Sequence, residues 1–292
     1  MRIRVPATSA NLGCGFDSVG FAVNLYLELE VLGPSLKWEI IHELSDDIPC
    51  DESNLIISTA RSIAPELPPH VIRMTSDIPL TGGLGSSSSA LVAGIELASA
   101  LGKLDLSTHE KLSIACRMEG HHDNVAPAIL GGLVIGTYSN GHLEYVKVDL
   151  PDVGLVVYVP NYRMSTDTMR KILPQELPYG EAVLASSISN VMVAALVSGD
   201  MAKAGNMMER DMFHEKYRRA LVPDLDKVRS CARKHGAYAT YLSGAGSAIM
   251  CIVPPNKTDE LTCALSKLSD ARVLKLLLEP AGAHVLNHHT RA

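Results

Sequence analysis

The chain has 292 residues, of which 47% are apolar and 20% charged, and its formal net charge is −6. This apolar content is enough to offset the ordering entropy of folding, which excludes intrinsic disorder. The mildly acidic balance and the absence of a Lys/Arg run argue against a nucleic-acid partner. The composition therefore predicts a soluble globular protein of one large or two ordinary domains.

Regular patterns begin early in the chain. Residues 20–31 alternate apolar and polar side chains, which predicts a strand with one buried face, and 71–78 form a second extended segment. Helices are predicted over 90–101 and 107–119, the second capped at Ser107 or its neighbour.

A hairpin and a buried strand follow. Asn140-Gly141 is a strong turn signal between extended segments 133–138 and 143–148. The run 153–160 is apolar throughout, which predicts a short strand.

Helices and strands alternate in the second half. We expect helices near 180–198, 200–213, 224–235 and 256–268, and strands near 237–242, 247–253 and 272–278. Strands first and alternation later predict an α+β protein rather than a doubly wound sheet. We place a domain boundary between 1–152 and 153–292.

Membrane and export signals are weak. The best span candidate, residues 182–199, is interrupted by serines, and its apolar residues recur at helical spacing, which predicts a buried amphipathic helix. Those residues are Leu184, Ile188, Val191 and Ala195. Residues 1–6 do not begin a secretory signal, and the 6 cysteines show no CxxC. We expect reduced thiols, no membrane contact and a cytoplasmic location.

Three glycine-rich turns are the most informative feature. They lie at 6–17, 79–89 and 242–247, and none completes GxGxxG or carries the GK[ST] of a Walker loop, which disfavours dinucleotide folds and P-loop NTPases. In the second turn, glycines free the backbone and serines open a helix, whose N-terminus can hold an anion. Ser86 and its neighbours add hydroxyls that can hold phosphate oxygens or Mg²⁺. A simple helix cap behind a loose loop is the alternative.

Carboxylates and amides cluster after the second predicted helix, at Glu119, Asp123 and Asn124. One Glu and one Ser, together with substrate phosphates, are ordinary ligands of Mg²⁺. His121 and His122 could instead hold a transition metal, but no further His or Cys stands nearby at ligand spacing, so we expect them to be solvated loop residues.

Two arginines stand among other polar residues farther along. Thr166 and Arg170 are one helical turn apart, and Asp211, His214 and Arg218 are spaced to share a helix face. Isolated arginines are usually surface residues. Here the polar neighbours raise the alternative of a clamp for a substrate carboxylate.

In this order, the three turns resemble the signature motifs of the GHMP small-molecule kinase superfamily. The segment GLGSSSSA at 83–90 is the most specific. The segments PATSANLGCGFDSVGFAVNLY at 6–26, EGHHDNVAPAILGG at 119–132, TDTMRKILP at 166–174 and EKYRRALVP at 215–223 are similar to its homoserine kinase family. The resemblance covers roughly residues 2–285.

The resemblance implies a fold and an activity. The fold would be an N-terminal domain like ribosomal protein S5 domain 2 followed by a ferredoxin-like C-terminal domain, commonly as a homodimer. The activity would be phosphorylation of L-homoserine by ATP with Mg²⁺, in threonine biosynthesis.

It also implies roles for individual residues. The phosphate loop would be Pro79, Leu80, Thr81, Gly82, Gly83, Leu84, Gly85, Ser86, Ser87, Ser88 and Ser89. Ser86 and Glu119 would position Mg²⁺ and, with Asn124, carry the catalysis. Homoserine would be held by Asn11, Asp17, Asp123, Asn124, Arg170 and Arg218, the arginines meeting its carboxylate and the aspartates its ammonium.

The chain departs from the family motifs at two turns. Cys14 replaces a proline in the first turn, and Ser247-Ala248 replaces Pro-Thr in the third. Because proline fixes φ, both changes loosen a turn without touching the chemistry.

Three alternatives stay open at this point. They are another GHMP kinase, acting on mevalonate, a sugar or shikimate; a catalytically inactive, ligand-sensing homologue; and a non-enzymatic metal-binding protein. The presence of Ser86 and Glu119 argues against the inactive homologue.

Overall fold

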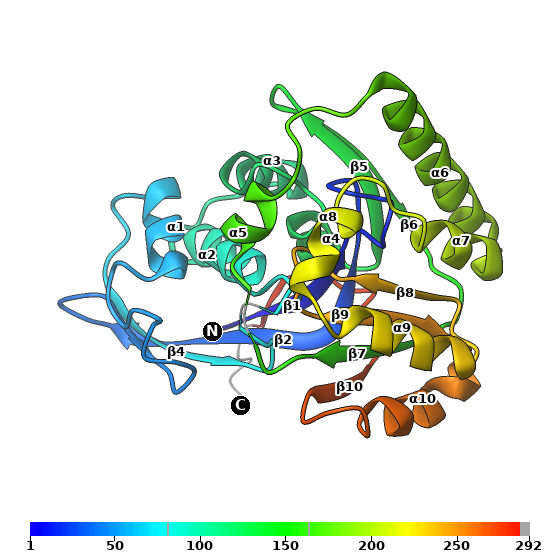
Figure 1. Ribbon diagram of the computed structural model, residues 1–292. Helices are drawn as coiled ribbons and strands as arrows, with labels where there is room; N and C mark the ends of the chain where they lie inside the picture. The colour runs from blue at the N-terminus through cyan, green and yellow to red at the C-terminus, as the bar shows by residue number, and fades with distance from the viewer. Residues whose placement is uncertain (81, 163, 287–292) are drawn as a thin grey trace.

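The structure is a computed structural model that describes residues 1–80, 82–162 and 164–286. It holds two sheets with helices packed around them (Figure 1). The first sheet contains β1 (Arg2–Ala10), β2 (Val19–Pro34), β3 (Glu39–Ile41), β4 (His70–Ser76), β5 (Leu133–Ser139), β6 (His142–Val148) and β11 (His284–Leu286). The second contains β7 (Gly154–Val159), β8 (Ala239–Leu242), β9 (Ile249–Val253) and β10 (Arg272–Leu276).

The helices are α1 (Leu55–Ile63), α2 (Ser86–Leu101), α3 (Thr108–Glu119), α4 (Val125–Leu130), α5 (Thr166–Lys171), α6 (Tyr179–Ser198), α7 (Met201–Met208), α8 (Glu215–Arg218), α9 (Leu225–Lys234) and α10 (Thr258–Leu265). Short 3₁₀ turns cover Arg219–Leu221 and Pro255–Lys257. The helix expected over 107–119 is confirmed as α3, and Ser107 and Glu110 form a capping box at its start.

The long strand β2 organises the first sheet. Its first residues, Val19 to Phe21, pair with β5, its later part pairs with β4, and β1 lies antiparallel along its other edge. The predicted alternation holds, because Leu27 and Leu29 are buried while Glu28 and Glu30 are partly exposed. The hairpin expected at Asn140-Gly141 joins β5 to β6.

The second sheet has the ferredoxin-like arrangement. Its four antiparallel strands lie in the order β10-β7-β9-β8, which is 4-1-3-2 in chain order. The expected α+β class is thereby confirmed. The last strand, β11, returns to pair with β1 in the first sheet, so the division at residue 152 stays a prediction.

The apolar strand β7 separates two cores. Leu155 and Val157 belong to a large core shared with the first sheet, while Val156 and Tyr158 pack into a smaller core with α9 and α10. Because both faces are covered, all six residues of β7 are buried.

Two helices differ from the sequence expectation. Helix α2 begins at Ser86 rather than residue 90, so the serines form its first turn. The helix expected over 200–213 ends at Met208. Beyond it, the Asp211 carboxylate accepts the N–H groups of Phe213, His214 and Glu215, and the chain turns into α8.

The expected burial of α6 is only partly right. Ile188 and Ala195 are buried, but Leu184 is 47% and Val191 43% exposed, because the helix lies against its neighbours along a narrow stripe. Figure 1 shows α6 at the edge of the molecule. Among the described residues, α6 is also the one helix long and apolar enough to span a membrane by length and composition, a test that ordinary core helices also pass.

Candidate active site

The three glycine turns meet around one cavity of about 430 Å³. The third turn is bonded to both of the others. Its Gly244 N–H donates to the Ala10 carbonyl (3.1 Å), and the Ser243 hydroxyl donates to the Gly83 carbonyl (2.7 Å). Segments more than 150 residues apart in the chain are thereby held in one framework, between the two sheets.

Close backbone packing explains two glycines of the second turn. A Cβ on Gly83 would lie 2.3 Å from the Ser243 carbonyl oxygen, and one on Gly85 would lie 2.1 Å from the Thr8 hydroxyl oxygen. Both glycines have φ near +70°, a region that favours glycine. The loop can therefore reach its position only without side chains at these two residues.

The second turn leads directly into the N-terminus of α2. Gly85 is the N-cap and has no side chain with which to satisfy the first N–H groups of the helix. The first-turn residues Ser86, Ser87 and Ser88 line the cavity. This end of a 16-residue helix is therefore a place where an anion is stabilised.

Most of the predicted phosphate loop lines the cavity. The lining residues from this loop are Leu80, Gly82, Gly83, Gly85, Ser86, Ser87 and Ser88. Leu84 is a core residue instead, and the buried Ser89 hydroxyl donates to the Pro6 carbonyl (2.9 Å). Pro79 does not line the cavity, and Thr81 lies outside the described residues.

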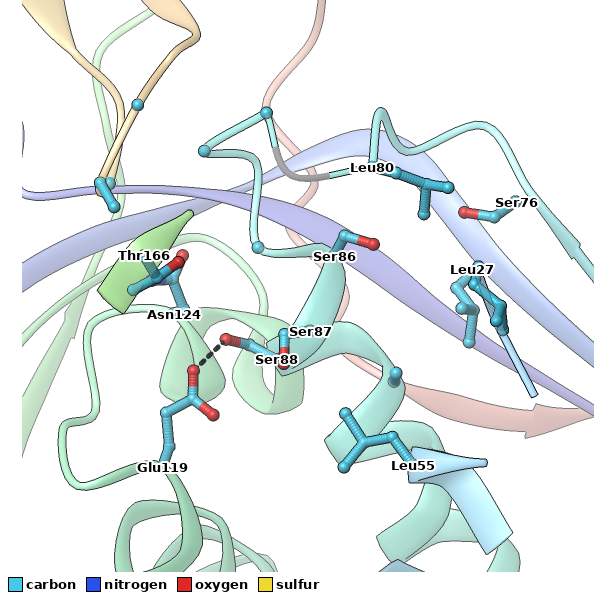
Figure 2. A pocket seen from close by; sticks show the side chains of 18 of the residues that line it. Leu27, Leu55, Ser76, Leu80, Ser86, Ser87, Ser88, Glu119, Asn124 and Thr166 are labelled. Atoms are coloured by element: carbon cyan, nitrogen blue, oxygen red, sulfur yellow. Dashed lines mark hydrogen bonds between the residues drawn. The ribbon is translucent and has the colours of Figure 1, made fainter. Parts of the chain in front are cut away.

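Glu119 enters the cavity from the end of α3. Its carboxylate accepts a hydrogen bond from the hydroxyl of Ser88, in the first turn of α2 (2.8 Å; Figure 2). Ser86 also lines the cavity, but Figure 2 shows its hydroxyl pointing away from Glu119. The pairing of Ser86 with Glu119 at a metal stays a prediction, and the sequence missed Ser88 as the direct partner of this carboxylate.

At the other end of the cavity, Asp17 and Arg170 form a bidentate ion pair. The Arg170 guanidinium donates to the two Asp17 oxygens at 2.8 and 3.1 Å, and both side chains remain about one-third exposed. The structure thus brings together two residues that were expected to hold opposite charges of homoserine, and here they pair with each other.

Asp123 is buried and paired with His121. The His121 Nδ1 and an Asp123 oxygen lie 2.6 Å apart. Burial disfavours the charged imidazole, but the hydrogen bond and charge of Asp123 outweigh it, so the pKa of His121 is raised. Ligand atoms of Asp17, His121 and Asp123 all lie within 4.8 Å of one another. This end of the cavity therefore has the charge to receive a cationic group.

The expectation that both histidines are solvated is wrong. The side chain of His121 is 18% exposed, and His122 is buried with its Nε2 3.2 Å from the Ser18 carbonyl. The loop folds back against the start of β2, so backbone and carboxylate partners replace water.

Two amides are oriented by neighbours. The Asn124 Oδ1 accepts the Thr8 hydroxyl (2.8 Å), which leaves its NH₂ group to donate to a ligand. Asn11 Nδ2 donates to the Gly244 carbonyl (2.9 Å), and its Oδ1 accepts the Asp17 N–H (3.0 Å). Asn124 is thus placed to touch a substrate, while Asn11 also holds the first turn in shape.

Arg218 is almost fully buried yet reaches the cavity wall. Its Nε donates to the Met169 carbonyl (2.9 Å), and one terminal nitrogen contacts the Gly244 carbonyl and His214, each at 3.1 Å. Burial, followed by the nearby charge of Arg170, lowers the pKa of Arg218 to about 10. It is therefore still cationic at neutral pH.

Several lining residues carried no sequence signal. The end of the cavity beyond Ser86 is walled by apolar side chains from separate elements, with Leu27, Leu55 and Leu80 drawn together in Figure 2. The apolar residues here are Leu27, Leu44, Ile48, Pro49, Leu55, Ile56, Met74 and Leu80, of which Leu80 alone belongs to the predicted phosphate loop. This lining suits an apolar group rather than a charged one.

Cys14, which replaces the motif proline, is an inert residue here. It is 1% exposed, and burial followed by the nearby Asp211 charge raises the pKa of its thiol to about 12. The thiol is therefore protonated at neutral pH and poorly reactive.

Comparison with protein families identifies both halves of the chain. Residues 54–132 match the GHMP kinases N terminal domain, and residues 192–270 match the GHMP kinases C terminal domain.

Curated relatives and solved structures agree with this. Homoserine kinase from Enterococcus faecalis is 52% identical over 269 residues, covering 92% of this chain and 94% of its own. Homoserine kinase from Listeria welshimeri is 52% identical and covers 98% and 99%. The crystal structure of homoserine kinase from Cytophaga hutchinsonii superposes with a TM-score of 0.86 at 27% identity, over 98% of this chain and 97% of that one. Mevalonate kinase from L. major shares the fold, with a TM-score of 0.74 at 18% identity and 97% coverage of both chains.

Proposed function

The chain belongs to the GHMP kinase family, among its homoserine kinases, and we propose that it phosphorylates L-homoserine with ATP to give O-phospho-L-homoserine, a step of threonine biosynthesis. The observation that carries the proposal is one cavity with two unlike ends. The N-terminus of α2 suits a triphosphate, while Asp17, Arg170 and Arg218 supply both charges that a small zwitterion requires.

The reaction requires positioning and charge stabilisation more than covalent work by the protein. The side-chain hydroxyl oxygen of homoserine bonds to the γ-phosphorus as the bond from that phosphorus to the β,γ-bridging oxygen breaks, and ADP leaves with that oxygen. Asn124 cannot take the proton at neutral pH, but its NH₂ group can orient the hydroxyl. We infer that the proton leaves late, to phosphate or water.

The residues at the helix end fit Mg²⁺. Glu119 is a carboxylate with one oxygen engaged by Ser88, and hydroxyls of the same turn face the cavity where phosphates would lie. One carboxylate, hydroxyls and phosphate oxygens are the hard donors that Mg²⁺ prefers. Glu119 with Ser86 would hold the ion, and Ser88 would hold the carboxylate. Bound there, Mg²⁺ would neutralise charge on the transferring phosphate.

An ADP-release assay across L-homoserine, mevalonate, galactose and shikimate tests the assignment. We expect turnover with homoserine at a kcat/KM at least about 100-fold above the others, because only homoserine offers both charges to the site. Mass spectrometry of the product should show O-phosphohomoserine. Comparable turnover of mevalonate or a sugar would replace this assignment with another kinase of the family.

Replacing Asp17 by asparagine distinguishes substrate binding from proton abstraction. We expect the homoserine KM to rise about tenfold or more while kcat at saturation changes less than about threefold, because the variant loses charge toward the ammonium but no base. Initial rates at saturating ATP measure both constants. A kcat lowered by orders of magnitude at unchanged KM would make Asp17 the base.

We further propose that the chain acts in the cytoplasm as a homodimer. The exposed side of α6 supports self-association, because Val183, Val191 and Val197 are 43–58% exposed and residues 182–199 contain no charged side chain. A second copy could cover this face without burying an unpaired charge. Sedimentation velocity of the full chain measures the state directly.

A further inference from the structure

His214 is a buried histidine that the reaction described above does not use. It lies at the N-cap of α8 and is 0% exposed, with its ring stacked on Phe16 at 5.1 Å between centroids. Phe16 belongs to the first glycine turn, whereas α8 carries Arg218. His214 therefore joins two segments of the substrate end that are about 200 residues apart.

The partners of His214 decide where its proton lies. The Nε2 atom is 3.0 Å from the Gly13 carbonyl oxygen, which can only accept a hydrogen bond. The Nδ1 atom is 3.1 Å from a terminal nitrogen of Arg218, which can only donate. Both contacts are satisfied only when the ring is neutral with its hydrogen on Nε2.

The charged groups around His214 permit this neutral form. Asp211 lies 3.7 Å from Nε2, but its oxygens already accept three backbone N–H groups at the start of α8. Glu215 is held by Arg229 (2.6 Å) and by the Leu242 N–H. Burial of the ring lowers the pKa of His214, and Arg218 on the Nδ1 side also opposes a second positive charge.

The neutral ring has a consequence for Arg218. Its Nε is engaged by Met169, and one terminal nitrogen is shared by His214 and Gly244. The guanidinium also lies over the Phe16 ring, 5.4 Å from its centroid. Within the described part of the chain, no hydrogen bond engages the second terminal nitrogen of Arg218, and the residue lines the cavity. We infer that this nitrogen is available to a ligand.

We propose that His214 is a positioning residue, whose neutral Nε2–H form aims Arg218 at the substrate carboxylate and ties it to the first glycine turn. The inference rests on the proposed function, because it takes Arg218 to bind that carboxylate.

A matched pair of amide variants separates the two contacts of His214. In His214→Asn the amide oxygen can replace Nδ1 as the acceptor for Arg218, whereas in His214→Gln the amide nitrogen can replace Nε2 as the donor to Gly13. We expect His214→Gln to raise the homoserine KM about tenfold or more, because a hydrogen bond to a charged group is lost, with kcat and the ATP KM within about threefold. The homoserine KM of His214→Asn should rise much less, because the acceptor for Arg218 is kept. His142→Gln, on the exposed β6, is the control.

Equal homoserine KM values for the two amide variants, or a parallel rise of the ATP KM, would overturn the proposal and leave His214 a packing residue. Thermal unfolding of each variant checks that it is folded.

A second measurement needs neither turnover nor a variant that folds. The nitrogen-15 chemical shifts of the His214 imidazole in the parent protein at pH 7 should report a neutral ring protonated on Nε2. A charged ring, or one protonated on Nδ1, would overturn the proposal. If the ring has the expected form but the parent does not phosphorylate homoserine, the proposed function fails and the assignment of the tautomer stands.

Discussion

Glu119→Gln should lower kcat by at least about 100-fold, equivalent to about 2.7 kcal/mol of transition-state stabilisation. The amide keeps the shape of the side chain and can still accept the Ser88 hydroxyl, so the local structure should persist. The variant loses the negative charge of the carboxylate, which we propose as a ligand of Mg²⁺. Steady-state rates at several Mg²⁺ concentrations measure the effect, and the Mg²⁺ needed for half-maximal rate should rise as well.

Glu144→Gln is a suitable control, because Glu144 is exposed on β6. An unchanged rate for Glu119→Gln at ordinary Mg²⁺ concentration would remove Glu119 from the metal site. Ser86→Ala and Ser88→Ala then show which hydroxyl acts there. If Ser86 is a ligand and Ser88 only orients the carboxylate, Ser86→Ala should raise the Mg²⁺ requirement more.

Arg218→Leu should raise the homoserine KM by about 30-fold or more, because truncating one partner of a buried charge pair typically costs 2–5 kcal/mol. The ATP KM should stay within a few-fold, since we propose that the triphosphate binds at the N-terminus of α2. An esterified homoserine, which has no negative charge, should be a poor substrate for the parent. Its kcat/KM should fall much less than that of homoserine when Arg218 is replaced. Initial-rate measurements with both substrates test this.

The burial of Arg218 adds a second effect. Its loss leaves the carbonyls of Met169 and Gly244 without this donor, so we expect the free energy of unfolding to fall by about 1–3 kcal/mol. Arg219→Leu is a matched control, because this adjacent arginine is exposed and pairs with Asp226 at the surface. Equal weakening of ATP and homoserine by Arg218→Leu would contradict the clamp and assign Arg218 to the fold or the nucleotide site.

Local features of the chain were largely predictable from its sequence. The capping box at Ser107 and the Asn140-Gly141 hairpin follow from contacts between residues a few positions apart. The alternation in β2 follows from the two-residue period of a strand with one buried face. The α+β class followed from the order of these patterns. The motifs themselves pointed to the kinase family through the resemblance, because they mark phosphate-binding and charged segments.

The tertiary structure decided how those segments meet. Asp17 and Arg170 are 153 positions apart, and nothing local could show that they form a bidentate pair. The choice of Ser88 over Ser86 as the partner of Glu119 depends on where α2 begins, which Gly85 decides by its close approach to Thr8. The exposure of Leu184 and Val191 on α6 likewise reflects which neighbours are present to cover the helix.

The position of the proton on His214 also depends on the tertiary structure rather than on the local sequence. Its spacing from Arg218 is visible in the sequence, but the form of its ring is determined by the Gly13 carbonyl, which the fold brings from the opposite end of the chain. Short-range patterns indicate which elements form because they record local backbone preferences and the face that each element can bury. Charges, tautomers and cavity walls depend on atoms brought together by long-range packing, and so they belong to the tertiary structure.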